Sequence, residues 1–288
     1  MKILAILISI LAAVTLAYGA HFQNAAFDKD KKHGISGALS FKNLKKLLTE
    51  KRWLGGFSFI AIAAVLQVTA LTMAPLIVVQ PVGAIALVIT ALLTARSSKT
   101  PITKNSWIAI ALSTFGIGTF VIFAANVAEN VELNDASLLT VLGLLIAILV
   151  ILAVSFFTFA RKAKALAYII GAGVLYGFVA SLMKVVVQRI IQGDFEWLTV
   201  LCVVATVGAV VLGGWFVQSA YASGPPDLVV AGLTVIDPMV GVAIGIVILG
   251  EAQKADFVTM FFFGLSAAVA ILGVWLLSKV HPELAKKA

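Results

Sequence analysis

Long apolar stretches alternate with short polar links along almost the whole chain. A transmembrane helix needs about 20 mostly apolar residues to cross a hydrocarbon core of about 30 Å. We therefore predict nine membrane-spanning helices, at 3–20, 53–73, 74–95, 106–127, 137–160, 165–190, 197–220, 228–250 and 257–278. The pattern predicts an all-α polytopic integral membrane protein in which residues 1–288 form one transmembrane domain.

The composition excludes several classes of function. Apolar residues make up 61% of the chain against roughly 45–50% in soluble proteins, so no soluble catalytic domain fits beside the spans. The single Cys202 lies in an apolar stretch, and His21, His33 and His281 are far apart, so the sequence contains no disulfide framework and no metal motif. It contains no glycine-rich nucleotide-binding loop either. We do not expect an enzyme.

Basic residues gather in alternate links. The segments 21–52, 96–105, 161–164 and the C-terminal tail are basic, whereas the links that contain Glu129 and Asp194 are acidic or neutral. With nine spans, every strongly basic segment falls on one side, which the positive-inside rule makes cytoplasmic. We therefore expect a multi-pass protein of the plasma membrane, with the N-terminus outside and the C-terminus inside. This placement also argues against a nucleic-acid partner for the net charge of +8.

The N-terminal region allows more than one interpretation. Lys2, the apolar stretch after it and the small residues 17–20 could form a cleavable signal peptide. Cleavage would leave the most basic segment outside the cell, so we favour a retained helix. In the basic loop 27–52, apolar residues recur at helical spacing from Phe41 to Leu48, opposite lysines. This pattern fits either a short amphipathic helix on the anionic cytoplasmic leaflet or a solvated loop.

The second half of the chain resembles the first half in order. Segments 16–19, 67–75, 79–83 and 117–118 match 174–177, 218–226, 236–241 and 272–273. We predict repeat one at 1–127, a connector helix at 137–160 and repeat two at 165–278. Since the first unit and the connector contain an odd number of spans, the second unit enters the membrane upside down. Inverted repeats of this kind build many secondary transporters.

Two polar residues at membrane depth are the first candidates for binding a substrate. Asp237 lies roughly 15 Å deep if the helix rises about 1.5 Å per residue, and a carboxylate at that depth is functional by default. It could couple transport to protons, bind a cation, or hydrogen-bond to a neighbouring helix. Lys184 could pair with Asp237, bind an anionic group of the substrate, or extend to the interface.

The repeat adds further candidates. Gln67 and Gln218 occupy equivalent depths, Tyr176 is the counterpart of Tyr18, and Asn24 shares a helix face with Tyr18. All five could bind substrate, or they could tie helices together.

Pro81 and Pro238 occupy matching positions in the two halves. A proline inside a spanning helix removes a backbone hydrogen bond, so we predict a break at each, and paired discontinuous helices indicate a transporter site. A packing kink without a ligand is the alternative. Gln80, directly before Pro81, joins the candidate substrate-binding residues. Gly116 and Gly118 predict a close helix contact.

The segment 70–84 resembles the AYAFAPATLVTPLGAL segment of the NIPA-like branch of the drug/metabolite transporter superfamily. Residues 50–56 resemble the tryptophan-containing entry to that segment, and 248–251 resemble the leucine–glycine–glutamate ending of an EamA-type helix. The resemblance implies nine or ten helices in inverted repeats and transport of small solutes, magnesium among them. Gln80 replaces the threonine of that branch, which puts the family's substrate in doubt for this chain.

The leading hypothesis is a secondary-active transporter of a small metabolite or drug-like solute, with alternating access to a site near the midplane. A transporter or channel for magnesium or another divalent cation is the alternative, because one or two carboxylates commonly hold Mg²⁺. A non-transporting scaffold or lipid-binding subunit is the alternative of another class, and Asp237→Asn would leave it unaffected. We expect no cofactor beyond a coupled proton or other cation. The expected partners are the solute or cation and the lipid bilayer, and a homodimer is left open.

Overall fold

The computed structural model describes residues 1–31, 51–97, 102–159, 164–223 and 226–286. Within these residues all regular secondary structure is α-helical, which confirms the predicted class. The helices are α1 (Lys2–Lys31), α3 (Lys51–Met73), α4 (Leu76–Gly83), α5 (Ile85–Ser97), α6 (Lys104–Val127), α7 (Asp135–Phe159), α8 (Lys164–Gln192), α9 (Trp197–Ser223), α10 (Pro226–Val247) and α11 (Phe257–Lys286). The predicted amphipathic helix of the basic loop lies outside the described residues.

Eight stretches of helix in the described residues are long and apolar enough to cross a membrane. They correspond to eight of the nine predicted spans, and the chain is a polytopic helical membrane protein. The ninth prediction, 228–250, forms α10, whose described apolar part, Gly232–Val247, is shorter than those eight. α10 ends at Val247, three residues before the predicted end, and in the link after it Gly250 takes a left-handed conformation, with φ of 68°.

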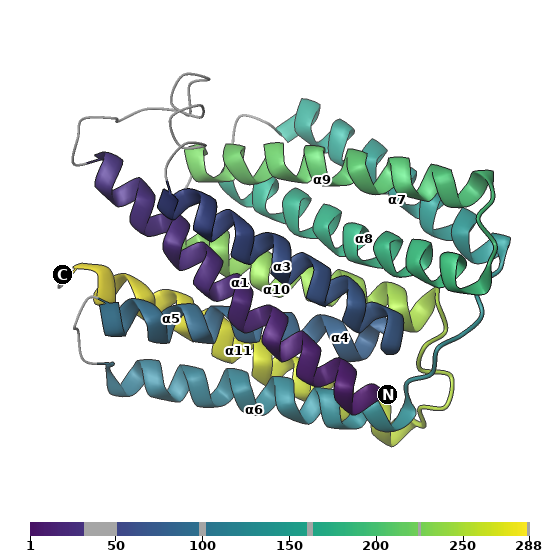
Figure 1. Cartoon of the computed structure of the whole chain (residues 1–288), viewed down its shortest axis with the longest axis horizontal. Coiled ribbons are helices and arrows are strands. Elements are labelled where there is room, and N and C mark those ends of the chain that lie inside the picture. The colour runs from purple at the N-terminus through teal and green to yellow at the C-terminus, as the bar shows by residue number, and fades with distance from the viewer. Residues whose placement is uncertain (32–50, 98–101, 160–163, 224–225, 287–288) are drawn as a thin grey trace.

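The axes of the helices are roughly aligned, and the helices pack in pairs. The two labelled termini lie at opposite ends of the bundle (Figure 1). The closest pairs are α1 with α3, α8 with α9, and α6 with α11, while α10 lies along α8. The short helix α4 lies between α10, α1 and α6, and its residues from Leu76 to Val82 are all buried. The division into two inverted repeats stays a prediction.

Glycine allows the closest approach between α6 and α11. A Cβ atom added to Gly116 would lie 2.4 Å from the backbone nitrogen of Ala270, and one added to Gly273 would lie 2.3 Å from the nitrogen of Ser113. Gly118 has open space at the same position. Of the two glycines predicted at this contact, only Gly116 therefore lies in it.

The predicted helix breaks lie elsewhere. α10 continues through Pro238 without interruption, so the break predicted there is wrong. The first half is divided twice, between α3 and α4 at Pro75 and between α4 and α5 at Ala84, whereas Pro81 lies inside α4. A proline lacks the N–H that a helix start leaves without a partner, so Pro75 suits the beginning of a helix. Packed neighbours in a membrane bundle tolerate the bond that Pro238 removes.

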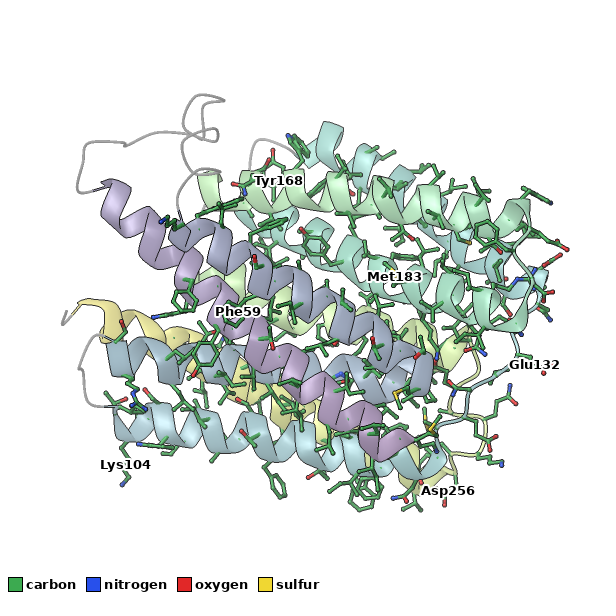
Figure 2. The ribbon with its side chains drawn as sticks, in the orientation of Figure 1. Phe59, Lys104, Glu132, Tyr168, Met183 and Asp256 are labelled. Atoms are coloured by element: carbon green, nitrogen blue, oxygen red, sulfur yellow. The ribbon has the colours of Figure 1, made fainter. Side chains whose placement is uncertain are left out.

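Charged side chains mark the two ends of the bundle. Figure 2 shows Glu132 and Asp256 at the end where the N-terminus lies and Lys104 at the opposite end. At the acidic end, Arg189 is buried and pairs with Asp135 at 2.8 Å and with Asp194 at 3.3 Å. Large apolar side chains are exposed along the helices between these ends, as contact with lipid requires. Which end faces the cytoplasm stays a prediction.

Candidate functional site

The break between α3 and α4 leaves backbone polar groups inside the bundle. α3 ends at Met73 and α4 begins at Leu76, so carbonyl oxygens of the last turn of α3 and N–H groups of the first turn of α4 have no partner within their own helices. Such groups persist in a membrane protein only where other protein groups or a polar cavity satisfy them. The charged side chains of Lys184 and Glu251, from other parts of the fold, form hydrogen bonds with these groups.

Lys184, from α8, binds the end of α3. Its Nζ donates hydrogen bonds to the carbonyl oxygens of Leu71 at 2.8 Å and Ala74 at 3.0 Å, and to Oδ1 of Asn130 at 2.9 Å. The residue is only 3% exposed, so it does not extend to the interface. Since these three bonds use all three donors of the ammonium, the predicted pair between Lys184 and Asp237 is not formed in this structure.

Glu251, from the turn after α10, binds the start of α4. Its Oε1 accepts from the backbone N–H of Leu76 at 2.8 Å and its Oε2 from that of Ile77 at 2.9 Å. The residue is 2% exposed. Burial raises the pKa of Glu251 above its usual value, while the two N–H donors and the positive charge of Lys184 act against that rise.

Among the described residues, Nε of Arg189 and Oε1 of Gln192 near the end of α8 are buried without a hydrogen-bond partner, and so are two atoms on α4 and α10. The latter two are Nε2 of Gln80, on α4, and Oδ1 of Asp237, on α10. Gln80 packs on α10 at Gly241, where an added Cβ atom would lie 2.6 Å from Nε2. Since Gly241 follows Asp237 by four residues, the two lie on one face of α10, about 6 Å apart. The structure therefore places Gln80 against α10 one turn from Asp237, and the donor of the one and the acceptor of the other are both unsatisfied.

The opposite side of this contact is α8. A Cβ atom added to Gly177 would lie 2.9 Å from the carbonyl oxygen of Asp237 and 2.5 Å from Cβ of Val240. Ser181, one turn further along α8, is buried and donates its hydroxyl to the carbonyl of Gly177 at 2.8 Å. The glycine thus lets α10 lie directly on α8 at the backbone of Asp237, while α10 packs on α4 at Gly241.

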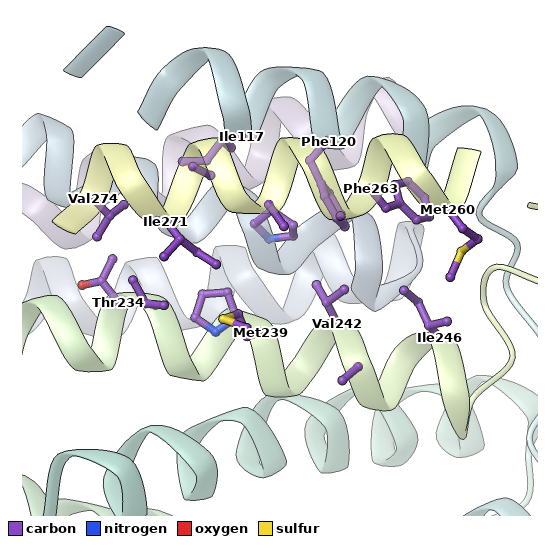
Figure 3. A pocket seen from close by; sticks show the side chains of 18 residues that line it. Ile117, Phe120, Thr234, Met239, Val242, Ile246, Met260, Phe263, Ile271 and Val274 are labelled. Atoms are coloured by element: carbon purple, nitrogen blue, oxygen red, sulfur yellow. The ribbon is translucent and has the colours of Figure 1, made fainter. Parts of the chain in front are cut away.

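A cavity of about 350 Å³ lies on another face of α10, towards α11 (Figure 3). Its lining is apolar apart from Thr234 and includes both Pro81 and Pro238. Neither Gln80 nor Asp237 lines it. The cavity is therefore suited to an apolar group.

The remaining predicted residues do not join this contact. Tyr18 is 39% exposed, with its ring 6.4 Å from that of Phe59, and Gln218 is exposed on α9. Tyr176 packs against α9, where a Cβ atom on Gly213 would lie 3.1 Å from its ring. Gln67 is half-buried on α3. The side chain of Asn24 lies outside the described residues.

Sequence reasoning missed two residues at the helix break, Glu251 and Asn130. The sequence indicates a helix ending at 248–251, and the signal it offers for Glu251 is the glycine directly before it, because a glycine can turn the chain so that the next side chain points back into the fold. Asn130 carries no comparable signal, because it lies in the link between α6 and α7 and is placed only by the fold. The described residues contain no group of three His, Cys, Asp or Glu side chains that could hold a metal ion.

The fold and the site define a polytopic helical membrane protein with a divided central helix and a polar contact in its core. The chain is 24% identical to an uncharacterized protein of Corynebacterium glutamicum over 284 residues, which cover 96% of each chain. It is 25% identical over 252 residues to a protein of Arabidopsis thaliana named probable magnesium transporter NIPA9, covering 83% of this chain and 73% of that one. No family model and no solved structure matches the chain.

Proposed function

We propose that this chain transports a small polar or cationic solute across a membrane, and that Asp237 and Gln80 bind it. The observation that carries the proposal is the pair of buried, unsatisfied polar atoms, Oδ1 of Asp237 and Nε2 of Gln80, at the contact of α4 with α10. One solute that offers both a donor or positive charge and an acceptor would satisfy both atoms at once. The predicted orientation, with the N-terminus outside, is part of the proposal.

The energetic cost of the contact supports this assignment. A buried polar atom without a partner costs about 1–3 kcal/mol, and a carboxylate within a membrane span costs more. Well-packed apolar side chains at both positions would remove that cost, so the two residues are best explained by a state of the protein in which they have a partner. A solute that enters from one side and leaves from the other provides such a state.

Magnesium is the more specific candidate, supported by the name of the Arabidopsis thaliana relative and by the carboxylate at Asp237. Mg²⁺ keeps several water molecules and is usually bound through one or two carboxylates. A site with one carboxylate and one amide therefore suits a hydrated ion better than a dehydrated one. A metabolite that carries both an amino group and a carbonyl or hydroxyl oxygen would use the same two residues through hydrogen bonds.

Transport by purified protein in proteoliposomes tests the proposal. Uptake of Mg²⁺ is followed with an entrapped indicator dye, and a panel of labelled amino acids, amines and sugars is followed by filtration. We expect uptake of at least one of these solutes above empty vesicles, and a loss of about tenfold or more in Asp237→Asn. The control, Glu132→Gln, makes the same chemical change at an exposed acidic residue of the link before α7 and should transport normally.

Two results would contradict the proposal. If Asp237→Asn moves every transported solute at the wild-type rate, Asp237 and Gln80 are not the site. If the wild type moves none of the solutes, whichever side of the vesicle membrane is made more acidic, a non-transporting scaffold or lipid-binding subunit becomes the better account. The apolar cavity beside α11 would then be its lipid contact.

A further inference from the structure

Three oxygen atoms surround the ammonium of Lys184 at distances of 2.8–3.0 Å. Two are the backbone carbonyls of Leu71 and Ala74 at the end of α3, and the third is Oδ1 of Asn130. Carbonyl and amide oxygens are the ligands of hard inorganic cations, and carbonyls released by a broken helix coordinate Na⁺ in many secondary transporters. The group around Lys184 thus has the composition of a cation site, with the cation supplied by a side chain.

The electrostatics of the break favour one positive charge at this point. The C-terminal end of α3 carries about half a negative charge from its helix dipole. The carboxylate form of Glu251 adds one negative charge at the other side of the break, and both of its oxygens are already bound to N–H groups of α4. Glu251 therefore acts as a counter-charge and not as a ligand. A single positive charge balances it, whereas a divalent ion would leave an excess in a buried place.

We propose that the oxygens of Leu71, Ala74 and Asn130 form a monovalent-cation site in which the ammonium of Lys184 is the resident cation. The wild-type protein then needs no Na⁺ or K⁺ at this position. A variant that lacks the ammonium leaves the site open to an inorganic monovalent cation from solution, with water as its remaining ligands. This inference goes beyond transport and does not depend on which solute the chain carries.

The test compares the wild type with Lys184→Met, which keeps an apolar stem and removes the ammonium. Both proteins are purified in detergent, and their midpoints of thermal unfolding are measured in choline chloride, NaCl, KCl and MgCl₂ at equal ionic strength. The pH is 8.5, because a proton on Glu251 would remove the charge that the inorganic cation has to balance. We expect the wild type to unfold at one temperature in choline chloride, NaCl and KCl. We expect the variant to gain about 3 °C or more in NaCl or KCl, saturating with concentration.

Two further variants separate a site from a general salt effect. In Lys184→Met/Asn130→Ala one oxygen ligand is gone, so the gain in NaCl or KCl should shrink or disappear. In Lys184→Met/Glu251→Gln no net charge is left to balance, so the midpoint should be the same in choline chloride, NaCl and KCl. Equilibrium binding of radioactive Na⁺ or Rb⁺ should appear in Lys184→Met and be absent from the wild type.

Specific results would overturn the inference. Equal midpoints of Lys184→Met in choline chloride, NaCl and KCl would show that no inorganic cation enters. A gain of the same size in the wild type or in the Asn130→Ala double variant would show a salt effect without a site. If Lys184→Met cannot be purified in any of the salts while Lys184→Met/Glu251→Gln can, an inorganic cation does not replace the ammonium.

Discussion

Lys184 and Glu251 bind opposite sides of the same helix break. The lysine donates to the carbonyls of Leu71 and Ala74 at the C-terminal end of α3, and the glutamate accepts from the N–H groups that begin α4. Each charge therefore meets the helix end whose dipole it complements. Both side chains belong to the second half of the chain and the break to the first, so these bonds also hold the two halves together at the acidic end of the bundle.

The first prediction concerns Glu251. In Glu251→Ala, two buried N–H groups lose their acceptor and Lys184 loses its counter-charge, so we expect the free energy of unfolding to fall by about 2–4 kcal/mol. Titration with SDS in mixed micelles measures it. Glu129→Ala is the matched control, because Glu129 pairs with Lys254 at an exposed position and such pairs contribute at most about 1 kcal/mol. Equal losses in the two variants would contradict the account of the break.

The second prediction separates function from stability at Gln80. In Gln80→Met the side chain keeps its length and loses a buried donor that has no partner, so we expect an unchanged or higher midpoint of thermal unfolding. Uptake of the transported solute should nevertheless fall about tenfold. A residue that serves only packing would show the reverse. Gln253→Met, the same change at an exposed residue, should alter neither quantity.

The third prediction concerns the contact between α6 and α11. A methyl group in Gly116→Ala meets the backbone of Ala270, which cannot give way as a flexible side chain can, so the two helices must separate. We expect a loss of about 1–3 kcal/mol in the free energy of unfolding. Gly118→Ala meets open space and should be neutral or stabilise the helix by up to about 1 kcal/mol. Similar effects in both variants would mean that α6 and α11 do not approach as described.

The fourth prediction concerns pH. The hydroxyl and the backbone N–H of Thr259 donate to Asp256 before α11 and hold the pKa of this carboxyl below its usual value. A lowered pKa in the folded state contributes stability above the unfolded pKa of about 3.9, and this contribution disappears as the pH falls through the folded value. The midpoint of the wild type should therefore exceed that of Asp256→Asn at pH 6, and the difference should narrow below about pH 4. A difference that stays constant down to pH 3 would contradict this.

Most of the helices could be predicted from the sequence because the signal is local. About 20 apolar residues in succession are a property of the chain itself, and the bilayer imposes the length. Asp237 and Gln80 were also found in this way, since a polar residue within an apolar stretch is visible without a fold. The positions of the helix breaks were not found, because a proline is compatible with a helix start, as at Pro75, and with a helix interior, as at Pro238.

The sequence by itself therefore determined the class of protein, eight of its spans and the two polar residues of the proposed site. Only the tertiary structure decided the partners of Lys184, which are mainly backbone carbonyls, and every residue has a carbonyl. It also decided that Glu251, far away in sequence, accepts hydrogen bonds from the N–H groups at the other side of the break. Local burial and helix length follow from the order of residues, whereas the pairing of charges with helix ends depends on how the two halves pack.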